Sequence, residues 1–363
     1  MKPDFVVSFP GLGINDLFVS RVVFTIFGLP VYWYGLLIAV AIILGMLLAM
    51  REAKKFSLSS DDVMDTFIAL IPLMIVFARI YYVIFSWKEY SSDWTLIFDT
   101  RRGGLAFYGG VIGGALGIIL VTRLKKIKIS RLLDFLVVYV PLGQAIGRWG
   151  NFFNQEAFGN NTTLPWGMIS KSASGTSTGT FEYLAWLLGK NPSLNLVKDN
   201  PVHPTFLYEF IANIIIFFVL YRIRKTSKTP FKVTLWYLML YGFVRFFVEG
   251  IRTDPLMLGS TSIRVSQWLS ALMVIVSAIV LVVLSRRRQR KELAAALAGE
   301  EFILPATDEE LVDFSAFVEI GEEPASDFQE IEQAEDTASP AEKEAPPSGS
   351  ESAAPPDDAE NKD

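Results

Sequence analysis

Three arginines lie inside stretches of sequence that are otherwise apolar: Arg79, Arg148 and Arg245. An arginine at the centre of a membrane-spanning helix costs roughly 2.5–3.5 kcal/mol on insertion scales, so each needs a compensating partner or a function. The guanidinium is always charged and binds phosphate through a planar pair of N–H donors. These residues therefore predict a site for a phosphate-bearing ligand, and an anionic phospholipid headgroup is the natural candidate.

Each of these charges also has a structural explanation that the sequence leaves open. Arg79 and Arg148 could extend their side chains from a helix to the lipid headgroups. Arg245 and Glu249 lie four residues apart on one helix face, where they could form an ion pair. We favour a binding site because Arg148 is followed by a run of Asn, Gln and Glu among aromatic residues, which is unusual at a membrane face.

A glycine string and a single histidine are further candidates. Glycines recur every three or four positions between residues 103 and 117. The later ones are typical of close packing between helices, whereas the segment 101–110, with two arginines, could also cradle a phosphate through its backbone. His203 precedes Pro204 at the start of an apolar stretch, so it is either a helix-entry residue or a functional group.

The composition is that of a membrane protein. Of 363 residues, 51% are hydrophobic, the mean hydropathy is +0.37, and the chain has one His and no Cys. These values exclude an ordinary water-soluble domain and a zinc or disulfide scaffold. Seven stretches are long enough to cross a hydrocarbon core that needs about 20 residues, the fourth and sixth being marginal. They run over residues 29–50, 63–85, 104–121, 132–148, 205–221, 233–249 and 265–284.

Lys and Arg gather in alternate connections between the predicted spans. Residues 51–60, 123–131, 222–232 and 286–291 are rich in them, whereas 86–102 and 250–264 are balanced or poor. Cytoplasmic loops retain positive charge, so we predict that the N-terminus lies outside and the C-terminus inside. The three arginines then fall in the outer half of the membrane.

These patterns divide the chain into four parts. We predict an interfacial N-terminal segment 1–28, an all-α domain of seven transmembrane helices at 29–285 with a flexible outer arm at 157–202, a basic juxtamembrane segment 286–299, and a tail 300–363. The tail holds 21 of the 38 acidic residues and two of the 33 basic ones, which gives it a net charge of −19. Its low apolar content predicts a disordered, cytoplasmic acidic tail.

Several motifs resemble one known family. The sequence 147–156 resembles the G-R-x-G-N-F-x-N-x-E motif of the prolipoprotein diacylglyceryl transferases, and four further blocks follow in the family's order. These blocks are Trp33-Tyr34-Gly35, Gly103-Gly104-Leu105-Ala106-Phe107-Tyr108-Gly109-Gly110, His203-Pro204-Thr205-Phe206-Leu207-Tyr208-Glu209, and Tyr241-Gly242-Phe243-Val244-Arg245-Phe246-Phe247-Val248-Glu249 with Arg252. The resemblance covers roughly residues 20–285 and leaves out the tail.

The resemblance implies an enzyme of lipoprotein biosynthesis. Such a protein would move the diacylglyceryl group of phosphatidylglycerol onto the lipobox cysteine of a prolipoprotein signal peptide, form a thioether and release glycerol phosphate. It would be a multi-pass protein of the bacterial plasma (inner) membrane with an active site facing the outer leaflet, and would need no cofactor, metal or nucleic-acid partner. The absence of Cys in this chain fits, because the substrate thiolate would be the nucleophile.

The matching motifs also imply roles for single residues. Arg148 would hold the lipid phosphate, with Asn151, Glu156 and Gly159 shaping the same pocket. Arg245 would stabilise the leaving phosphate.

The remaining residues of the implied site come from other blocks. Glu249 would orient Arg245, Tyr34 and Tyr241 would line the site, and Arg79 is a further candidate for substrate binding. The sequence departs from the family at Arg79, because many members have Gly-Ala-Arg where this chain has Phe77-Ala78-Arg79. Close helix packing at that position is therefore not assumed.

Activation of the substrate thiol is a separate question. Some family members have His where this chain has Tyr108, so a histidine base at that position is not assumed. A free thiol has a pKa of about 8.5, and we expect Arg148 and Arg245 to lower it. Tyr108 would then donate a hydrogen bond to a phosphate or ester oxygen, and His203 is the alternative base.

A secondary transporter of an anionic solute is the alternative function. Broken helices and buried arginines suit such a protein. The sequence has no internal repeat, and its polar residues gather toward one side of the predicted membrane rather than at its centre. We therefore favour the transferase.

Overall fold

The computed structural model describes residues 3–99, 103–173, 197, 200–254, 257 and 263–298. In this part of the chain, seven helical segments are long and apolar enough to cross a membrane, as the sequence predicts. Six of them are single helices: α1 (Trp33–Glu52), α2 (Ser60–Phe85), α4 (Phe107–Lys125), α8 (Thr205–Thr226), α9 (Lys232–Ile251) and α10 (Val265–Ala298). The predicted tail 300–363 lies outside the described residues.

The predicted fourth span is broken into two helices, α5 (Ile129–Leu136) and α6 (Tyr139–Asn154), where a continuous one was expected over 132–148. Pro141 explains the break, because it has no N–H for the carbonyl of residue 137 and its ring crowds that carbonyl. The second part also runs six residues beyond Arg148, so Asn151 lies on the same helix as Arg148.

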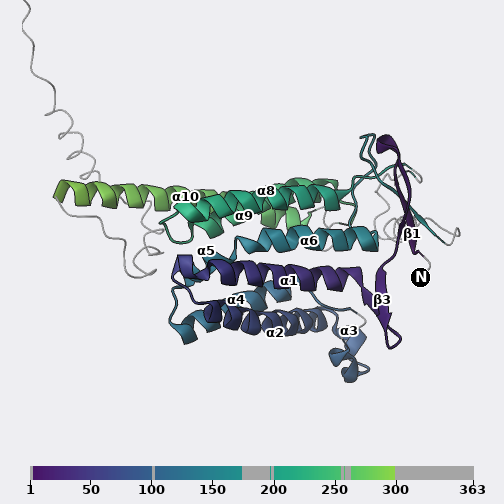
Figure 1. Ribbon diagram of the computed structural model, residues 1–363, viewed down its shortest axis with the longest axis horizontal. Helices are drawn as coiled ribbons and strands as arrows, with labels where there is room; N and C mark the ends of the chain where they lie inside the picture. The colour runs from purple at the N-terminus through teal and green to yellow at the C-terminus, as the bar shows by residue number, and fades with distance from the viewer. Residues whose placement is uncertain are drawn as a thin grey trace, which may run out of the picture. The chain divides into compact units, whose positions relative to one another are not determined.

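The helices pack in an order that differs from their order in the chain. α4 packs on α2, α2 on α1, and α1 on α6; α6 then packs on α8, α8 on α9, and α9 on α10. Figure 1 shows them running side by side along the long axis of the view. α6, the helix that carries Arg148, is therefore central: α4, α2 and α1 lie on one side of it in this order, and α8, α9 and α10 on the other.

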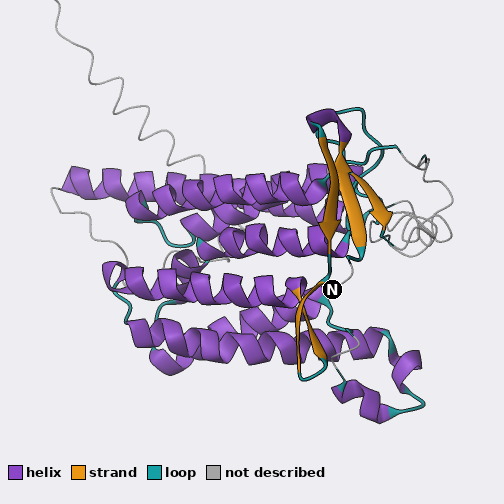
Figure 2. Cartoon of the chain, turned by 45° about the vertical axis from the view of Figure 1, so that its right-hand side comes forward, coloured by secondary structure: helices purple, strands orange, loops and turns teal. Residues whose placement is uncertain are grey.

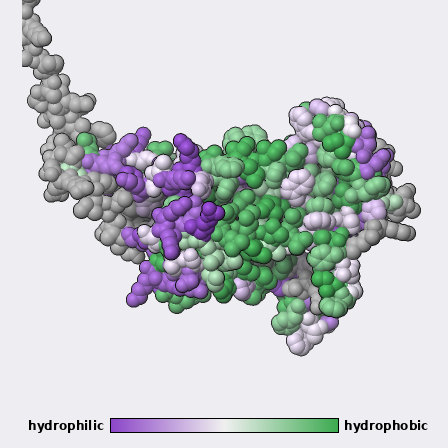
Figure 3. Space-filling view, viewed as in Figure 1, coloured by the Kyte–Doolittle hydropathy of each residue, from purple (hydrophilic) through white to green (hydrophobic). Residues whose placement is uncertain are grey.

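The two ends of the helix bundle differ in character. At one end, which we call the basic end, Lys125 of α4 lies 3.6 Å from Asp62 of α2, and Arg288 of α10 donates a 3.0 Å hydrogen bond to Thr229. Figure 3 shows hydrophilic residues gathered there and a hydrophobic surface along the middle of the bundle. This arrangement is that of a membrane-spanning bundle with polar ends.

The opposite end, which we call the strand end, carries the strands β1 (Phe5–Phe9), β2 (Ile14–Val19), β3 (Val22–Ile26), β4 (Leu29–Tyr32) and β5 (Ile169–Ser172) (Figure 2). They form an antiparallel sheet in the order β2-β1-β5 and a β3-β4 hairpin. The expectation of an all-α chain is therefore wrong in this respect.

The strands have a local cause in the sequence that the hydropathy pattern obscured. β1 alternates buried and half-buried residues, which is the period of a strand. Phe5, Val7 and Phe9 pack in a core with Phe158 and Phe206. Leu29–Tyr32, expected to open the first span, form β4 instead, so α1 begins at Trp33.

Part of the predicted outer arm is tied into this sheet. β5 pairs with β1 in the register Phe5↔Ser172, and Met168 forms a bridge with Val202. Residues 157–173 are therefore ordered by backbone hydrogen bonds and not a free arm; residues 174–196 of the arm lie outside the described residues.

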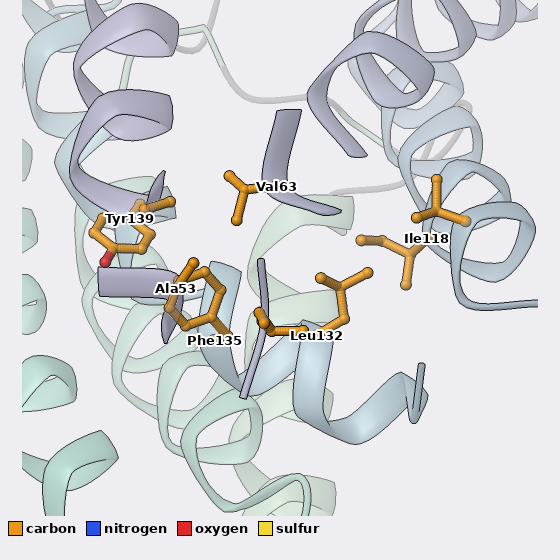
Figure 4. Close-up of a cluster of buried hydrophobic side chains, with 9 residues drawn as sticks. Ala53, Val63, Ile118, Leu132, Phe135 and Tyr139 are labelled. Atoms are coloured by element: carbon orange, nitrogen blue, oxygen red, sulfur yellow. The ribbon is translucent and has the colours of Figure 1, made fainter. Parts of the chain in front are cut away.

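Short helical segments complete the described chain: η1 (Pro10–Leu12), η2 (Ala53–Phe56), α3 (Trp87–Tyr90) and η3 (Trp94–Phe98). The hydrophobic core near the basic end joins five of the helical elements through Ala53, Val63, Ile118, Leu132, Phe135 and Tyr139 (Figure 4). Buried Arg224 of α8 lies beside this core, with its guanidinium 4.6 Å from the ring centre of Phe56 and paired with the carboxylate of Glu52.

The glycine string brings α4 against α2, as predicted for its later half. A Cβ atom at Gly113 would overlap the backbone carbonyl of Leu73, and one at Gly109 would overlap that of Phe77. At Gly114, by contrast, a Cβ atom would meet the Met74 Cγ at 3.6 Å, which is an ordinary contact. The two helices therefore touch along one face of the string.

This difference gives a matched pair of substitutions. Either Gly113→Ala or Gly114→Ala adds helix propensity worth about 1 kcal/mol. Gly113→Ala also forces the α2 backbone away, at a cost of about 1–3 kcal/mol for overpacking. We expect Gly113→Ala to unfold at a lower temperature than the wild type in detergent, and Gly114→Ala at the same or a higher temperature. Equal unfolding temperatures for the two variants would contradict this packing.

Candidate functional site

Two arginines and two glutamates from three helices meet at the strand end. Arg148 of α6 lies with its Nη2 2.7 Å from Oε2 of Glu209 on α8. The other oxygen of the same carboxylate, Oε1, lies 3.3 Å from Nη1 of Arg245 on α9. Arg245 also pairs with Glu249, one helical turn further along α9. One buried carboxylate thus bridges the two arginines that the sequence singled out.

Exposure differs between the two kinds of charge. The side chains of Glu209 and Glu249 are each 2% exposed, whereas those of Arg148 and Arg245 are 19% and 16% exposed. The carboxylates therefore lie behind the guanidiniums, which reach the accessible side of the cluster. Each guanidinium has five N–H donors, and the described contacts of Arg148 and Arg245 leave some of them for a ligand.

Local features of the helices place these side chains. Glu209 lies in the second turn of α8, where Asn213 hydrogen-bonds to its backbone carbonyl at 2.7 Å. Arg264, just before α10, donates to the backbone carbonyls of Glu249 and Arg252. A cation at this position stabilises the negative end of the α9 dipole. α10 thereby holds the helix end that carries Glu249.

The polar run after Arg148 connects the cluster to a second carboxylate. Arg148 contacts Asn151 at 3.5 Å, and Asn151 Nδ2 donates to Glu156 Oε1 at 3.0 Å. Asn154 donates to the same oxygen at 3.2 Å. The left-handed backbone at Gln155, with φ of 53°, ends α6 and turns the chain so that Glu156 lies back against the helix.

Tyr34 lies next to this carboxylate. Both residues line a pocket of about 500 Å³ that lies between the β3-β4 hairpin, the start of α1 and the end of α6, together with Arg21, Val31, Tyr32, Gly35, Leu36 and Asn154. A Cβ atom at Gly150 would overlap the Tyr34 ring, so glycine is needed there for the two helices to approach. The pocket is large enough for a small polar headgroup.

Tyr241 lies one turn before Arg245 on α9. Its ring stacks on Tyr237 with 5.6 Å between ring centres, and the Tyr237 hydroxyl accepts a 3.0 Å hydrogen bond from Gln144 of α6. Gln144 and Arg148 are four residues apart, so they share one face of α6. Polar groups therefore continue one helical turn deeper into the bundle than the arginines.

His203 and Gly159 lie where the chain crosses itself at the strand end. His203 Nδ1 lies 2.9 Å from the Tyr208 hydroxyl, which accepts a 2.8 Å hydrogen bond from Trp166. Gly159 donates its backbone N–H to the carbonyl of His203 at 2.9 Å, and a Cβ atom at Gly159 would come within 2.7 Å of the His203 Cβ. Burial lowers the pKa of His203 below its ordinary value.

Arg79 and Tyr108 lie elsewhere, on α2 and α4. The Arg79 guanidinium donates five hydrogen bonds to backbone carbonyls, those of Leu96, Ile97, Asp99, Gly103 and Gly104. All its donors are thereby used to hold the loop between these helices. The structure does not bring it to the Arg148 cluster, so its substrate-binding role stays a prediction. The Tyr108 ring lies 6.4 Å from that of Tyr81, also on α2.

Sequence reasoning assigned no role to Glu209, although it lies in the block that follows His203. An acidic residue inside an apolar span at the depth of two arginines was the available signal, because such charges are usually paired. Sequence reasoning also assigned no role to Asp254, which pairs with Arg252 through two hydrogen bonds of 2.8 and 2.7 Å. Within the described residues, no group of three or more His, Cys, Asp or Glu side chains could hold a metal ion.

Comparison with known proteins gives a family match that covers the region of the cluster. The family model described as prolipoprotein diacylglyceryl transferase matches residues 21–283. The phosphatidylglycerol–prolipoprotein diacylglyceryl transferase of Clostridioides difficile (strain 630) is 42% identical over 257 residues, 71% of this chain and 92% of the relative. The transferase of the same name from Finegoldia magna is 40% identical over 262 residues, 72% of this chain and 94% of the relative.

A third relative of that name, from Oceanobacillus iheyensis, is 39% identical over 262 residues, 72% of this chain and 86% of the relative. All of the cluster residues described above lie within the matched region, and the acidic tail lies beyond it. On the extent of these matches, the chain belongs to the prolipoprotein diacylglyceryl transferase family.

Proposed function

We propose that this chain transfers the diacylglyceryl group of phosphatidylglycerol to the cysteine thiol of a prolipoprotein lipobox, the first step of lipoprotein maturation. The observation that carries the proposal is the pair of accessible guanidiniums, Arg148 and Arg245, held on one buried carboxylate at an end of the bundle. Family membership supports the reaction, and this geometry supports binding of the lipid phosphate at the two arginines.

The proposed reaction is a substitution at carbon. The thiolate sulfur attacks the glyceryl carbon that carries the phosphate, and a C–S bond forms as the C–O bond breaks. The electron pair leaves on the phosphate oxygen, which converts a singly charged diester into the more highly charged glycerol phosphate. Charge therefore grows on the phosphate during the step, and preorganised guanidinium donors stabilise that growth.

The same positive charge acts on the nucleophile. A thiol has a pKa of about 8.5, and neighbouring arginines favour its thiolate form. With Arg148 and Arg245 at the phosphate, the thiol proton passes to solvent or to a nearby base. We assign no residue as an obligatory base; His203, whose Nδ1 lies 2.9 Å from the Tyr208 hydroxyl, is the alternative base that the pH dependence tests.

We infer that the strand end faces the outside of the cell. Support comes from the Lys and Arg residues of the basic end, since cytoplasmic loops retain positive charge. In this orientation the pocket beside Tyr34 and Glu156 opens at the outer surface of the plasma membrane. A secreted precursor, held there by its signal peptide, then presents its cysteine at the depth of Arg148.

The function is tested by incubating the purified protein with phosphatidylglycerol and a peptide that contains a lipobox cysteine. We expect the peptide mass to increase by that of a diacylglyceryl group, with release of glycerol phosphate. A peptide with Ser in place of the cysteine is the matched control and should keep its mass. An unmodified cysteine peptide, with a folded enzyme present, would refute the proposal.

Arg148 should be essential for this transfer. Arg148→Ala removes one of two phosphate-binding guanidiniums, and we expect kcat/KM to fall by a factor of about 10² or more. Arg148→Lys should recover little, because an ammonium cannot reproduce the planar pair of donors. The measurements are transfer rates together with thermal unfolding in detergent, and Arg123→Ala at the basic end is the control for loss of a charge. A folded Arg148→Ala protein with wild-type activity would contradict the assignment.

The pH dependence separates thiol activation by arginine from activation by histidine. Because burial lowers the pKa of His203, its imidazole is already neutral at about pH 7 and does not titrate above it. If the arginines make the thiolate, His203→Gln should lower the rate at every pH without moving the midpoint of the profile. Tyr108→Phe should behave in the same way.

The contrary result has a distinct pattern. Activity of folded His203→Gln that vanishes near pH 7 and returns in alkaline buffer would identify His203 as the base. A profile whose midpoint stays in place, with part of the rate retained, supports activation by the arginines.

A further inference from the structure

The four central charges of the site cancel one another. Arg148 and Arg245 contribute two positive charges, and Glu209 and Glu249 two negative ones. The nearest further charges also sum to zero, because Arg252 pairs with Asp254, and Arg264 at the end of α9 offsets Glu156 beyond Asn151. A site meant only to bind an anion tightly would not need a buried carboxylate between its arginines.

We infer that Glu209 is a positioning residue that holds the two arginines together and keeps their net charge low enough for glycerol phosphate to leave. The inference rests on the proposed transfer reaction. Glu209 would act in two ways: it fixes the geometry of the guanidiniums, and it sets the balance of charge. Each effect can be measured separately.

The geometry of the two guanidiniums is fixed by their hydrogen bonds to Glu209. Glu209 offers one oxygen to each guanidinium, at 2.7 Å for Arg148 and 3.3 Å for Arg245. Fixing an arginine side chain costs rotamer freedom, and two like charges repel each other at short range. The shared carboxylate offsets both effects before the lipid arrives. It lies in the second turn of α8, so the helix itself fixes its position.

The balance of charge matters because the product carries more negative charge than the lipid substrate. The lipid diester carries one negative charge, whereas a phosphate monoester carries about −1.5 to −2 at pH 7. A net positive site attracts the product more strongly than the substrate, because Coulomb energy scales with ligand charge. Removing the charge of Glu209 would leave the cluster of four with a net charge of +1. The product would then gain more affinity than phosphatidylglycerol would.

Glu52 provides a matched control at the other end of the bundle. Its carboxylate is also mostly buried and pairs with an arginine of α8, Arg224. It accepts hydrogen bonds from the hydroxyls of Tyr139 and Tyr221 at 3.1 and 2.8 Å. Glu52→Gln therefore removes a buried, paired carboxylate, with a comparable risk to stability, without touching the Arg148 cluster.

The experiment compares Glu209→Gln, Glu209→Asp and Glu52→Gln with the wild type in detergent. Calorimetric binding of glycerol 1-phosphate is measured first, because it requires no transfer activity. Values of kcat and KM for phosphatidylglycerol, and the unfolding temperature, are measured on the same preparations.

We expect Glu209→Gln to bind glycerol 1-phosphate at least about tenfold more tightly, a change of about 1.4 kcal/mol, and to lose most of its kcat with a KM that does not rise. Glu209→Asp keeps the charge but shortens the reach, so it should keep the wild-type affinity for glycerol 1-phosphate and lower kcat. Glu52→Gln should lower only the unfolding temperature.

Unchanged or weaker binding of glycerol 1-phosphate by Glu209→Gln would overturn the inference, as would an unchanged kcat. If Glu209→Gln does not fold, Glu209→Asp decides: reduced kcat with wild-type affinity supports the inference, and wild-type kcat overturns it. A wild type that binds glycerol 1-phosphate but transfers nothing would refute the proposed function alone. In that case tighter binding by Glu209→Gln would still establish the role of its charge.

Discussion

The carboxylate of Glu209, buried between two guanidiniums, is the interaction on which the site depends. It joins α6, α8 and α9, helices that meet here although the chain between Arg148 and Glu209 leaves the bundle to form β5. Breaking a buried pair by removing one partner costs about 3–5 kcal/mol, because an uncompensated charge is left behind. The sheet, the capped end of α9 and the end of α6 all lie around this point. None of them could shift far without separating these charges.

The arginines of the helix bundle are paired in three different ways, and each corresponds to a different role. Arg79 gives all its donors to backbone carbonyls and holds a loop. Arg224 pairs with Glu52 among aromatic rings and joins α8 to α1 at the basic end. Arg148 and Arg245 keep donors on an accessible side. α8 is therefore fixed by a buried ion pair near each end, about 22 Å apart. The two arginines whose guanidiniums are accessible are the ones suited to a ligand.

Support for the site comes from elements that do not touch its charges. β1 packs its buried face against Phe158 and Phe206, and Trp149, Phe152 and Phe153 of α6 lie against the same core. The sheet thus braces the helix end that carries Arg148 and Asn151. Gly150 allows Tyr34 to lie against this helix, and Gly159 allows the backbone to pass His203. Such rigid support matters because electrostatic stabilisation of a transition state requires donors that are already in place.

The sequence by itself determined the seven apolar spans, the packing of the later glycines and the shared helix face of Arg245 and Glu249, because each follows from composition or from helical spacing within one element. It also pointed to Arg148, through the polar run that follows it and through the family resemblance. It could not place the β-strands, because β4 reads as the start of a span and β1 pairs with β5, which is distant in the chain. It could not show that Arg79 uses its donors to hold a loop, since Arg79, like Arg148, is an arginine in an apolar helix. Only the tertiary structure decided that backbone carbonyls surround Arg79 and that the carboxylate of Glu209 on α8 meets Arg148. These partners are distant in the chain and are brought together by packing.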